Sequence, residues 1–390
     1  MKQSFWIPLG ILTLAGFTFN TSELIPIGLL SDIASSFGVS EARAGLLITV
    51  YAWVVALMSL PLMLLFAKLE FRRLMLGVVS VFFISHVATV LSTGYYSLMC
   101  ARIGVALAHS LFWSIAPAMA VAVSPPEKRA TALSTLVAGG GIALIAGLPL
   151  GRTLGIIAGW RMAFAALGVL AALVLAGLWL RFPSLPQKDT GESRKDMLRG
   201  LVTCRPLLVI YLITAVIVTG HYTGYSYIEP FMIQIVGMAE GSVTLTLSLF
   251  GVAGLLGSYI MSKYYARYSR RLILMSCLGF PIVMALLFPA GYISGWLLAV
   301  LCLAWGLCMT MYNIAFQNEI VTLFPNDSAV PMSFYSGIFN LGIGAGAFVG
   351  GIVCDYGLMA DIGYIGGAIA LAAAVYCVTR YMPMRPGAKM

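Results

Sequence analysis

Long apolar segments separated by short cationic clusters recur along the 390-residue chain and restrict it to one class of fold. Apolar residues make up 61% of the sequence and charged residues only 9%, which is too little charge to cover the surface of a water-soluble protein. A membrane-spanning helix needs about 20 mostly apolar residues. The sequence therefore predicts an all-α membrane protein.

We expect twelve transmembrane helices, each ending near a charged cluster or a Gly/Pro break. The predicted spans are residues 6–30, 44–66, 74–93, 97–121, 131–157, 161–182, 207–229, 243–263, 272–290, 295–320, 332–356 and 362–381. The first apolar stretch is too long for the core of a signal peptide, so we expect it to be a retained span.

The basic residues predict the orientation of these spans. If the N-terminus is cytoplasmic, all but four of the 23 Lys and Arg residues lie in cytoplasmic segments. The exceptions are Arg43 and Arg161 in outer loops and Arg102 and Arg152 within spans. Because cytoplasmic loops are enriched in Lys and Arg, we expect both termini to be cytoplasmic.

The longest polar connection divides the spans six and six. It predicts an N-terminal six-helix half at 1–182, a cytoplasmic linker at 183–206 and a C-terminal six-helix half at 207–390. Both halves carry a basic pair at the start of the third span and a glycine-rich fifth span. Two pseudo-symmetric halves are typical of transporters that work by alternating access around a cavity near the bilayer midplane.

Ionisable residues inside the spans are candidate functional groups, because a charge at the bilayer centre costs roughly 3 kcal/mol. Glu23 lies in the first span, three residues after Asn20 on the same face, and Arg102, His109 and Trp113 share one face of the fourth span. We interpret Glu23, His109 and Arg102 as proton-coupling residues. The alternatives are a structural carboxylate, a neutral packing histidine and an arginine that bonds neighbouring helices.

Aromatic and polar residues crowd the outer half of the seventh span. His221, Tyr222 and Tyr225 are candidates for a sugar-binding wall, because aromatic faces stack on the C–H surface of sugars. Tyr227 and Glu229 lie near the outer end, where a gate, a site or an interfacial anchor are all open interpretations.

Uncharged amides complete the candidate substrate site, since they bind hydroxyl groups without attracting ions. They equally often join membrane helices to one another. The predicted substrate-binding residues are Asn20, Glu23, Trp113, His221, Tyr222, Tyr225, Asn313, Gln317 and Asn340.

The remaining charged residues within spans look structural. We expect Glu319, Asp355 and Arg152 to reach water from the ends of their helices, and His86 to be an isolated packing residue. The glycines of the fifth and eleventh spans are expected to be close-packing surfaces.

Several function classes are not supported by the sequence. It contains no GxxxxGK[ST] phosphate-binding loop, no Cys pair or Cys/His cluster with zinc spacing, and no nucleophile–base arrangement. The basic residues do not form a nucleic-acid-binding face. We therefore expect neither an enzyme nor a bound cofactor or metal.

Several segments resemble known families. ARIGVALAH (101–109) resembles the fourth-helix arginine motif of the major facilitator superfamily, and GLPLGR (147–152) its fifth-helix antiporter segment. The loop around 64–73 follows the frame of GxLADRxGRR but has Lys68 at the acidic position. Segments 19–34, 49–61, 108–118, 220–231 and 335–350 are similar to bacterial sugar efflux transporters, within the drug:proton antiporter branch.

This resemblance implies the export of arabinose and isopropyl-thiogalactosides in exchange for protons. We therefore expect a monomeric, proton-coupled sugar exporter of the bacterial inner membrane, with lipid, protons and a small sugar as its partners. Other readings are a multidrug or purine-nucleoside exporter, an importer, or a non-transporting membrane scaffold.

Overall fold

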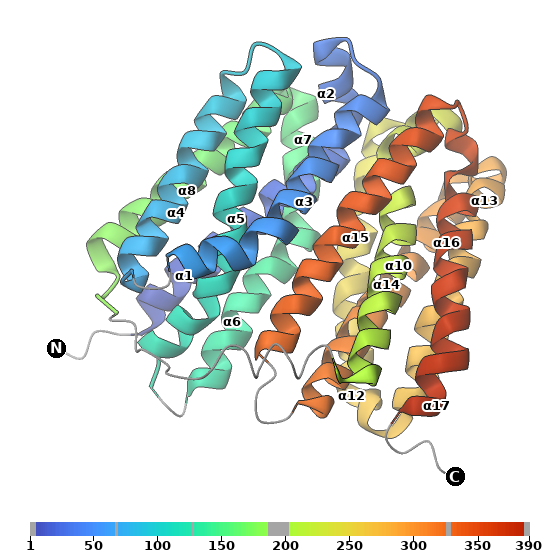
Figure 1. The fold of residues 1–390 in the computed structure, drawn as a ribbon. Helices are drawn as coiled ribbons and strands as arrows, with labels where there is room; N and C mark the ends of the chain where they lie inside the picture. The colour runs from blue at the N-terminus through green and yellow to red at the C-terminus, as the bar shows by residue number, and fades with distance from the viewer. Residues whose placement is uncertain (1–4, 67–68, 126–127, 186–202, 325–328, 386–390) are drawn as a thin grey trace. The chain divides into compact units, whose positions relative to one another are not determined.

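The computed structural model describes residues 5–66, 69–125, 128–185, 203–324 and 329–385, and every element within these ranges is helical (Figure 1). The chain divides into two compact units. Unit 1 contains residues 1–39 and 50–189, and unit 2 contains residues 40–49 and 190–390. The boundaries at 1–182, 183–206 and 207–390 stay predictions, because 186–202 lie outside the described residues.

The helices of the N-terminal part follow the predicted spans closely, and the fifth span is divided by a π-helical turn, η2. They are α1 (Trp6–Gly28), α2 (Leu30–Phe37), α3 (Glu41–Leu65), α4 (Phe71–Val90), α5 (Tyr95–Val123), α6 (Arg129–Ile142), η2 (Ala143–Gly147), α7 (Leu148–Ala158) and α8 (Trp160–Arg181).

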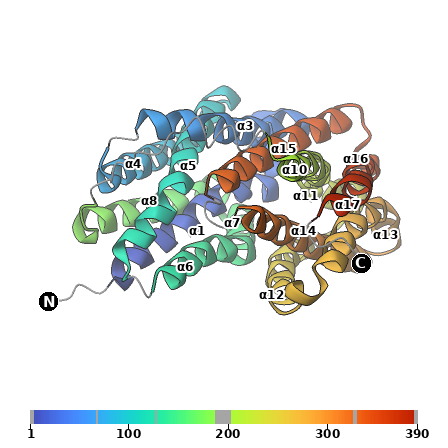
Figure 2. The same ribbon diagram turned by 60° about the horizontal axis from the view of Figure 1, so that its bottom comes forward.

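The helices of the C-terminal part include one of 46 residues, α12. They are α10 (Arg205–Tyr225), α11 (Ile228–Pro230), η3 (Phe231–Ile235), α12 (Glu240–Ala285), α13 (Leu287–Ile293), α14 (Gly295–Leu323), α15 (Ala329–Asp355), η4 (Met359–Asp361), α16 (Ile362–Tyr376), η5 (Cys377–Tyr381) and α17 (Met382–Met384). Within unit 2, α10 packs between α15 and α16 (Figure 2).

Ten helices of the described residues are long and apolar enough to cross a membrane. Two features explain why ten helices are found where twelve spans were predicted. The polar run from Asn20 to Glu23 interrupts the apolar sequence of α1, which is not among the ten. The helix α12 joins the predicted spans 243–263 and 272–290 through a non-helical residue, Tyr268. The number twelve and the cytoplasmic termini stay predictions.

Both units expose large apolar side chains where a water-soluble protein would expose polar ones. Leu180 in unit 1 is 72% exposed and Trp296 in unit 2 is 75% exposed, and many other Leu, Ile and Val side chains are also exposed. Such apolar surface needs a lipid environment. The structure is that of a multi-pass membrane protein.

Glycines bring α1 close to α6, η2 and α7 in unit 1, as the sequence predicts for the fifth span. A Cβ atom at Gly139 would meet the Thr13 carbonyl oxygen, one at Gly140 would meet the Asn20 amide, and one at Gly147 would meet the Thr21 side chain. Small residues permit this close approach of two helix backbones.

The glycines of the eleventh span have the same role in unit 2. A Cβ atom at Gly346 would meet the Thr219 carbonyl oxygen of α10, and one at Gly350 would lie 2.5 Å from the Thr223 carbonyl oxygen. The prediction of close-packing glycine surfaces is therefore confirmed in both units.

Glu70 joins the start of α4 to the end of α8. Its carboxylate accepts hydrogen bonds from the backbone N–H groups of Arg72 (3.0 Å), Arg73 (3.1 Å) and Leu185 (2.7 Å). The Arg72 side chain in turn donates to the carbonyl oxygens of Leu178 and Trp179 at the end of α8. Burial alone would raise the pKa of Glu70, but the backbone hydrogen bonds lower it below its usual value.

We expect Gly139→Ala to reduce stability, because the new methyl group meets the α1 backbone and overpacking of this kind costs about 1–3 kcal/mol. Gly141→Ala is the matched control, since nothing lies within 4 Å of its Cβ position. Thermal unfolding of the two purified variants in detergent measures the difference. Equal melting temperatures would contradict the packing role of Gly139.

We expect Glu70→Gln to reduce stability at neutral pH and to have little effect in acid. Because the folded-state pKa is lowered, the ionised carboxylate stabilises the fold above its unfolded-state pKa, and this contribution disappears as the pH falls through the folded-state pKa. Melting temperatures of the wild type and variant from pH 7 to pH 3 should therefore converge. A constant difference across that range would contradict this linkage.

Candidate functional site

The centre of the candidate site in unit 1 lies where α1, α3 and α5 meet. His109 on α5 is buried, and its Nε2 lies 3.8 Å from the Glu23 Oε2 on α1. The other ring nitrogen, Nδ1, lies 2.6 Å from the Tyr51 hydroxyl on α3, at hydrogen-bond distance. The imidazole therefore connects a carboxylate to a phenol across three helices.

Arg102 is the permanent cation of this centre and is 2% exposed. Its Nη1 donates a hydrogen bond to the Ser22 hydroxyl at 3.2 Å, and its guanidinium lies 4.6 Å from the centroid of the Tyr51 ring. It also faces the Phe164 ring at 5.6 Å. Among the described residues no carboxylate lies within ion-pair distance of Arg102, and its Nε has no hydrogen-bond partner.

His86 belongs to the same network, which corrects the expectation that it is isolated. Its Nδ1 donates to the Phe82 carbonyl oxygen (2.9 Å), so its Nε2 in the neutral ring accepts from the Ser22 hydroxyl (3.0 Å). Since Ser22 also accepts from Arg102, a continuous chain of hydrogen bonds runs from α5 through α1 to α4. His86 is also packed against Phe82, as expected of a core residue.

Asn20 and Trp113 form a separate polar contact beside this centre. The Trp113 Nε1 donates to the Asn20 Oδ1 at 3.1 Å, and the Asn20 amide lies against Gly140. The structure therefore pairs Asn20 with Trp113 and Glu23 with His109, and it bonds Arg102 to Ser22. The sequence singles out all of these residues except Ser22.

Three members of the unit 1 site were missed by the sequence reasoning: Ser22, Tyr51 and His86. Ser22 directly precedes Glu23, and Tyr51 lies in the apolar second span, where a tyrosine is easily taken for a packing residue. Their positions in three consecutive spans do not indicate that their side chains meet at one site.

In unit 2, His221 lies inside a buried group of rings that we call the aromatic cage: His221, Tyr225, Phe250, Phe280 and Trp305. The Trp305 Nε1 donates to the His221 Nδ1 at 2.8 Å, and the Tyr225 ring stacks on the imidazole at a centroid distance of 5.0 Å. Tyr222 meets the imidazole edge-on at 4.8 Å. The Tyr225 hydroxyl is buried and has no hydrogen-bond partner among the described residues.

The predicted amides of unit 2 do not form one group. Asn313 and Gln317 are bonded to each other, and the Asn313 Oδ1 also accepts from the Tyr335 hydroxyl, both at 2.9 Å. Asn340 donates to the Ser336 carbonyl oxygen of its own helix, while its Oδ1 is buried without a partner among the described residues. The structure gives no contact that joins Asn340 to the other two.

Tyr227 and Glu229 are buried inside unit 2 and do not face lipid. Tyr227 is 0% exposed and donates a hydrogen bond to the Ala347 carbonyl oxygen of α15 at 3.0 Å, and Glu229 is 1% exposed. This burial argues against the interfacial-anchor interpretation, because an anchor needs contact with the headgroup region.

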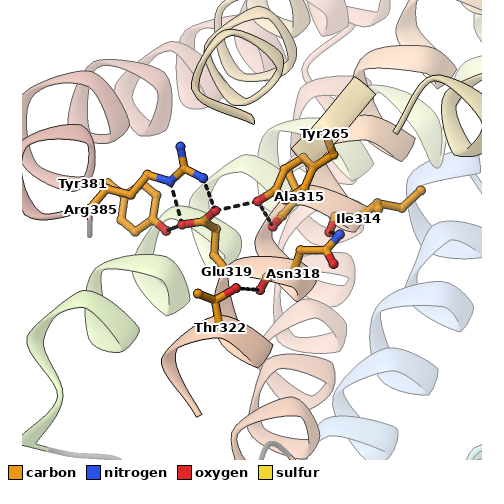
Figure 3. Close-up of polar contacts among 8 residues, drawn as sticks. All are labelled: Tyr265, Ile314, Ala315, Asn318, Glu319, Thr322, Tyr381 and Arg385. Atoms are coloured by element: carbon orange, nitrogen blue, oxygen red, sulfur yellow. Dashed lines mark hydrogen bonds and ion pairs between the residues drawn. The ribbon is translucent and has the colours of Figure 1, made fainter. Parts of the chain in front are cut away.

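Glu319 on α14 is the centre of a polar cluster in unit 2 that the sequence reasoning missed (Figure 3). Its carboxylate accepts hydrogen bonds from the hydroxyls of Tyr265 on α12 and Tyr381 on η5, each at 2.5 Å. Arg385 donates two more, from Nε at 2.8 Å and from Nη2 at 2.6 Å. The expectation that Glu319 reaches water is wrong, because these partners enclose it at 5% exposure.

The charge of Glu319 also acts on its arginine partner. Burial would lower the pKa of Arg385, but the hydrogen bonds and negative charge of Glu319 raise it. Arg152 is likewise buried, and it donates to the Gly28 carbonyl oxygen. Of the three charges expected near water, only Asp355 is exposed.

The described residues contain no group of three or more His, Cys, Asp or Glu side chains that could hold a metal ion. All seven cysteines are free.

We expect Glu319→Gln to destabilise unit 2 by about 3 kcal/mol, because removing one partner of a buried ion pair leaves the other uncompensated. Arg385→Gln should cost a similar amount, and the double variant less than the sum of both. Asn318→Ala is the control, since Asn318 is exposed and bonds only to its own helix. Unfolding in detergent measures all four, and additive losses would contradict the cluster.

Comparison with solved structures shows which known proteins share this fold. A D-xylose–proton symporter is 16% identical over 99% of each chain, with a TM-score of 0.78. The nucleoside transporter NupG is 14% identical over 96% of this chain and 99% of its own, with a TM-score of 0.76. A bacterial homolog of the human lysosomal transporter Spinster, inward-facing and unoccupied, is 17% identical over 97% and 95%, with a TM-score of 0.76.

The sequence itself identifies the family. The profile of the Major Facilitator Superfamily matches residues 12–331 and, in a second match, residues 215–389. Members of that family carry small molecules across membranes, which agrees with the exposed apolar helices and the buried polar centres described above. The chain belongs to the Major Facilitator Superfamily.

Proposed function

We propose that the chain is a proton-coupled exporter of small neutral sugars, such as arabinose and thiogalactosides, in the bacterial inner membrane. It works as a monomer by alternating access, and sugar leaves the cell in exchange for protons that enter. Glu23, His109 and Arg102 couple the proton. The substrate-binding residues are Asn20, Glu23, Trp113, His221, Tyr222, Tyr225, Asn313, Gln317 and Asn340.

The observation that carries this proposal is the contact between Glu23 and His109, 3.8 Å apart within an apolar bundle. The imidazole attracts the carboxylate as an ion only when it is protonated. In a medium of low dielectric constant, the gain or loss of one unit charge changes this attraction far more than it would in water. The arrival of a proton therefore alters how strongly α1 is held to α5.

Arg102 makes the charge balance of this centre depend on whether Glu23 carries a proton. With Glu23 ionised and His109 neutral, the charges of Glu23 and Arg102 balance within the centre. A proton on Glu23 leaves the buried guanidinium without an opposing charge among the described residues, which is costly in an apolar surrounding. The protonated and deprotonated centres therefore favour different arrangements of the helices, as a coupled transporter requires.

The residues proposed to bind the substrate are amides and aromatic rings, which suit a neutral polyhydroxyl molecule. Asn20 is held by Trp113, so an amide and an indole ring lie side by side on α1 and α5. Amides bind hydroxyl groups, while aromatic faces stack on the apolar side of a sugar ring. Sugar as the cargo also rests on the resemblance to sugar efflux transporters.

The twelve-span topology is part of this proposal. Two observations support it: α1 has 23 residues, enough to span, and α12 contains two apolar arms separated by Tyr268. With these counted, the arginine and lysine distribution favours two cytoplasmic termini.

A purine nucleoside is a second candidate cargo, because the stacked rings of His221 and Tyr225 offer a surface to a flat base. Direct binding of labelled arabinose to the purified chain, with adenosine as competitor, separates the two. Arabinose binding that adenosine does not displace supports the sugar proposal.

We expect Glu23→Gln to abolish proton-driven efflux while leaving the carrier folded. For one-for-one exchange, a difference of one pH unit supplies about 1.4 kcal/mol and supports about a tenfold sugar gradient. In vesicles loaded with labelled arabinose, this gradient should fall to about one in the variant. Exchange of labelled for unlabelled sugar at equal pH should persist, because it moves no net proton.

The control for this experiment is Asp355→Asn, which removes an exposed carboxylate. It should keep the full driven gradient. An unchanged gradient in Glu23→Gln would remove Glu23 from the coupling role.

A further inference from the structure

A segment of α12 around its kink carries cations and tyrosines that the proposed transport function does not use. We call residues 259–271 the α12 basic segment. Its cations are Lys263, Arg267, Arg270 and Arg271, all exposed. Tyrosines alternate with them along the helix, and Tyr259 and Tyr264 are 59% and 40% exposed.

The kink of α12 places this segment outside the hydrocarbon layer. Tyr268 separates an arm of 28 residues before it from an arm of 17 residues after it, about 42 Å and about 26 Å long at 1.5 Å per residue, and the apolar core of a bilayer is about 30 Å thick. Leu255 before the segment and Met275 after it are both highly exposed apolar side chains, so both arms face lipid. The charged middle, which contains the non-helical Tyr268, therefore lies at the membrane surface.

The cations of this segment have no opposing charge nearby in the sequence. No Asp or Glu occurs from Gly241 to Asn318, and among the described residues none of the four cations pairs with a carboxylate. The carboxylate of Glu319, reached by Tyr265 of this segment, is already paired with Arg385. The positive charge of the segment is available to an external anion.

The tyrosines of the α12 basic segment form cation–π contacts with its lysine and arginine side chains. The Lys263 Nζ lies 5.6 Å from the centroid of the Tyr259 ring and 5.5 Å from that of Tyr264. Arg267 and Arg271 both lie over the Tyr268 ring, at 5.3 and 5.8 Å. Tyrosine rings favour the headgroup depth of a bilayer, so they position these cations at the level of lipid phosphates.

Two other basic residues, Arg72 and Arg385, differ in this respect because their side chains are bonded within the protein. Arg72, which occupies the position of Arg270 in the N-terminal half, donates its side-chain hydrogen bonds to carbonyl oxygens of α8. Arg385 is bonded to Glu319. The α12 basic segment combines exposure, uncompensated charge and interleaved tyrosines.

We propose that the α12 basic segment is a binding site for the phosphate headgroups of anionic phospholipids such as phosphatidylglycerol. Arginine side chains form paired hydrogen bonds to phosphate oxygens, and lysine adds a point charge. Clusters of four or more basic residues beside a membrane-spanning helix favour anionic headgroups for the same reason. The proposal does not depend on which molecule the protein transports.

Native mass spectrometry of the full chain in mild detergent tests this site. Phosphatidylglycerol and phosphatidylcholine are offered at equal concentrations, and retention of phosphatidylglycerol is expected to dominate. The triple variant Arg267→Gln, Arg270→Gln, Arg271→Gln should bind it about a hundredfold more weakly, because each of the three cations contributes about fivefold. Rising ionic strength should also weaken binding to the wild type.

The matched control removes three other exposed cations: Lys128→Gln, Arg181→Gln and Arg380→Gln. It carries the same net charge as the triple variant and should bind phosphatidylglycerol like the wild type. An equal loss in both would mean that net charge alone attracts the lipid and would overturn the site. Full binding by the triple variant would overturn it as well.

Two further measurements keep the test decisive. If the triple variant does not fold in phosphatidylcholine, other variants replace it. A triple Arg→Lys variant should keep most of the phosphatidylglycerol binding. The single variants Arg267→Gln and Arg270→Gln should each bind phosphatidylglycerol more weakly than the wild type. Inorganic phosphate at the lipid concentration should not displace phosphatidylglycerol. Displacement would show a site for free phosphate in place of a lipid site.

Discussion

A polar group inside a lipid-facing bundle has to find its partners within the protein, because the surrounding hydrocarbon offers none. This constraint explains the most specific contacts of the structure. In unit 1 it binds Arg102 to Ser22 and places His109 between Glu23 and Tyr51. In unit 2 it surrounds Glu319 with four hydrogen bonds, donated by Tyr265, Tyr381 and Arg385. The few charged residues of an apolar chain thereby select which helices meet.

Hydrophobic segments predicted most of the helices, because helix formation is the general way to satisfy the backbone in lipid. The break between the predicted eighth and ninth spans, after residue 263 and before residue 272, contains Tyr268, the non-helical residue at which the two arms of α12 meet. The first span was less clear, because the polar run at Asn20 marks the candidate site and at the same time weakens α1 as an apolar span.

The candidate site was partly predictable for an energetic reason: Glu23, Arg102 and His109 are costly to bury and therefore stand out. Their partners do not stand out. Tyr51, His86 and Trp305 are residue types that often pack in cores, and their roles depend on contacts between helices distant in sequence. Glu319 was misjudged because its partner Arg385 lies 66 positions further along the chain.

We propose that sugar and proton are exchanged because they compete for the centre formed by Glu23 and His109. The most direct test is to add arabinose to the purified chain in weakly buffered detergent and to follow pH with an indicator dye. Competition requires that binding one ligand releases the other, so protons should be released by the wild type and not by Glu23→Gln. No release from the wild type, or equal release from both, would contradict the account.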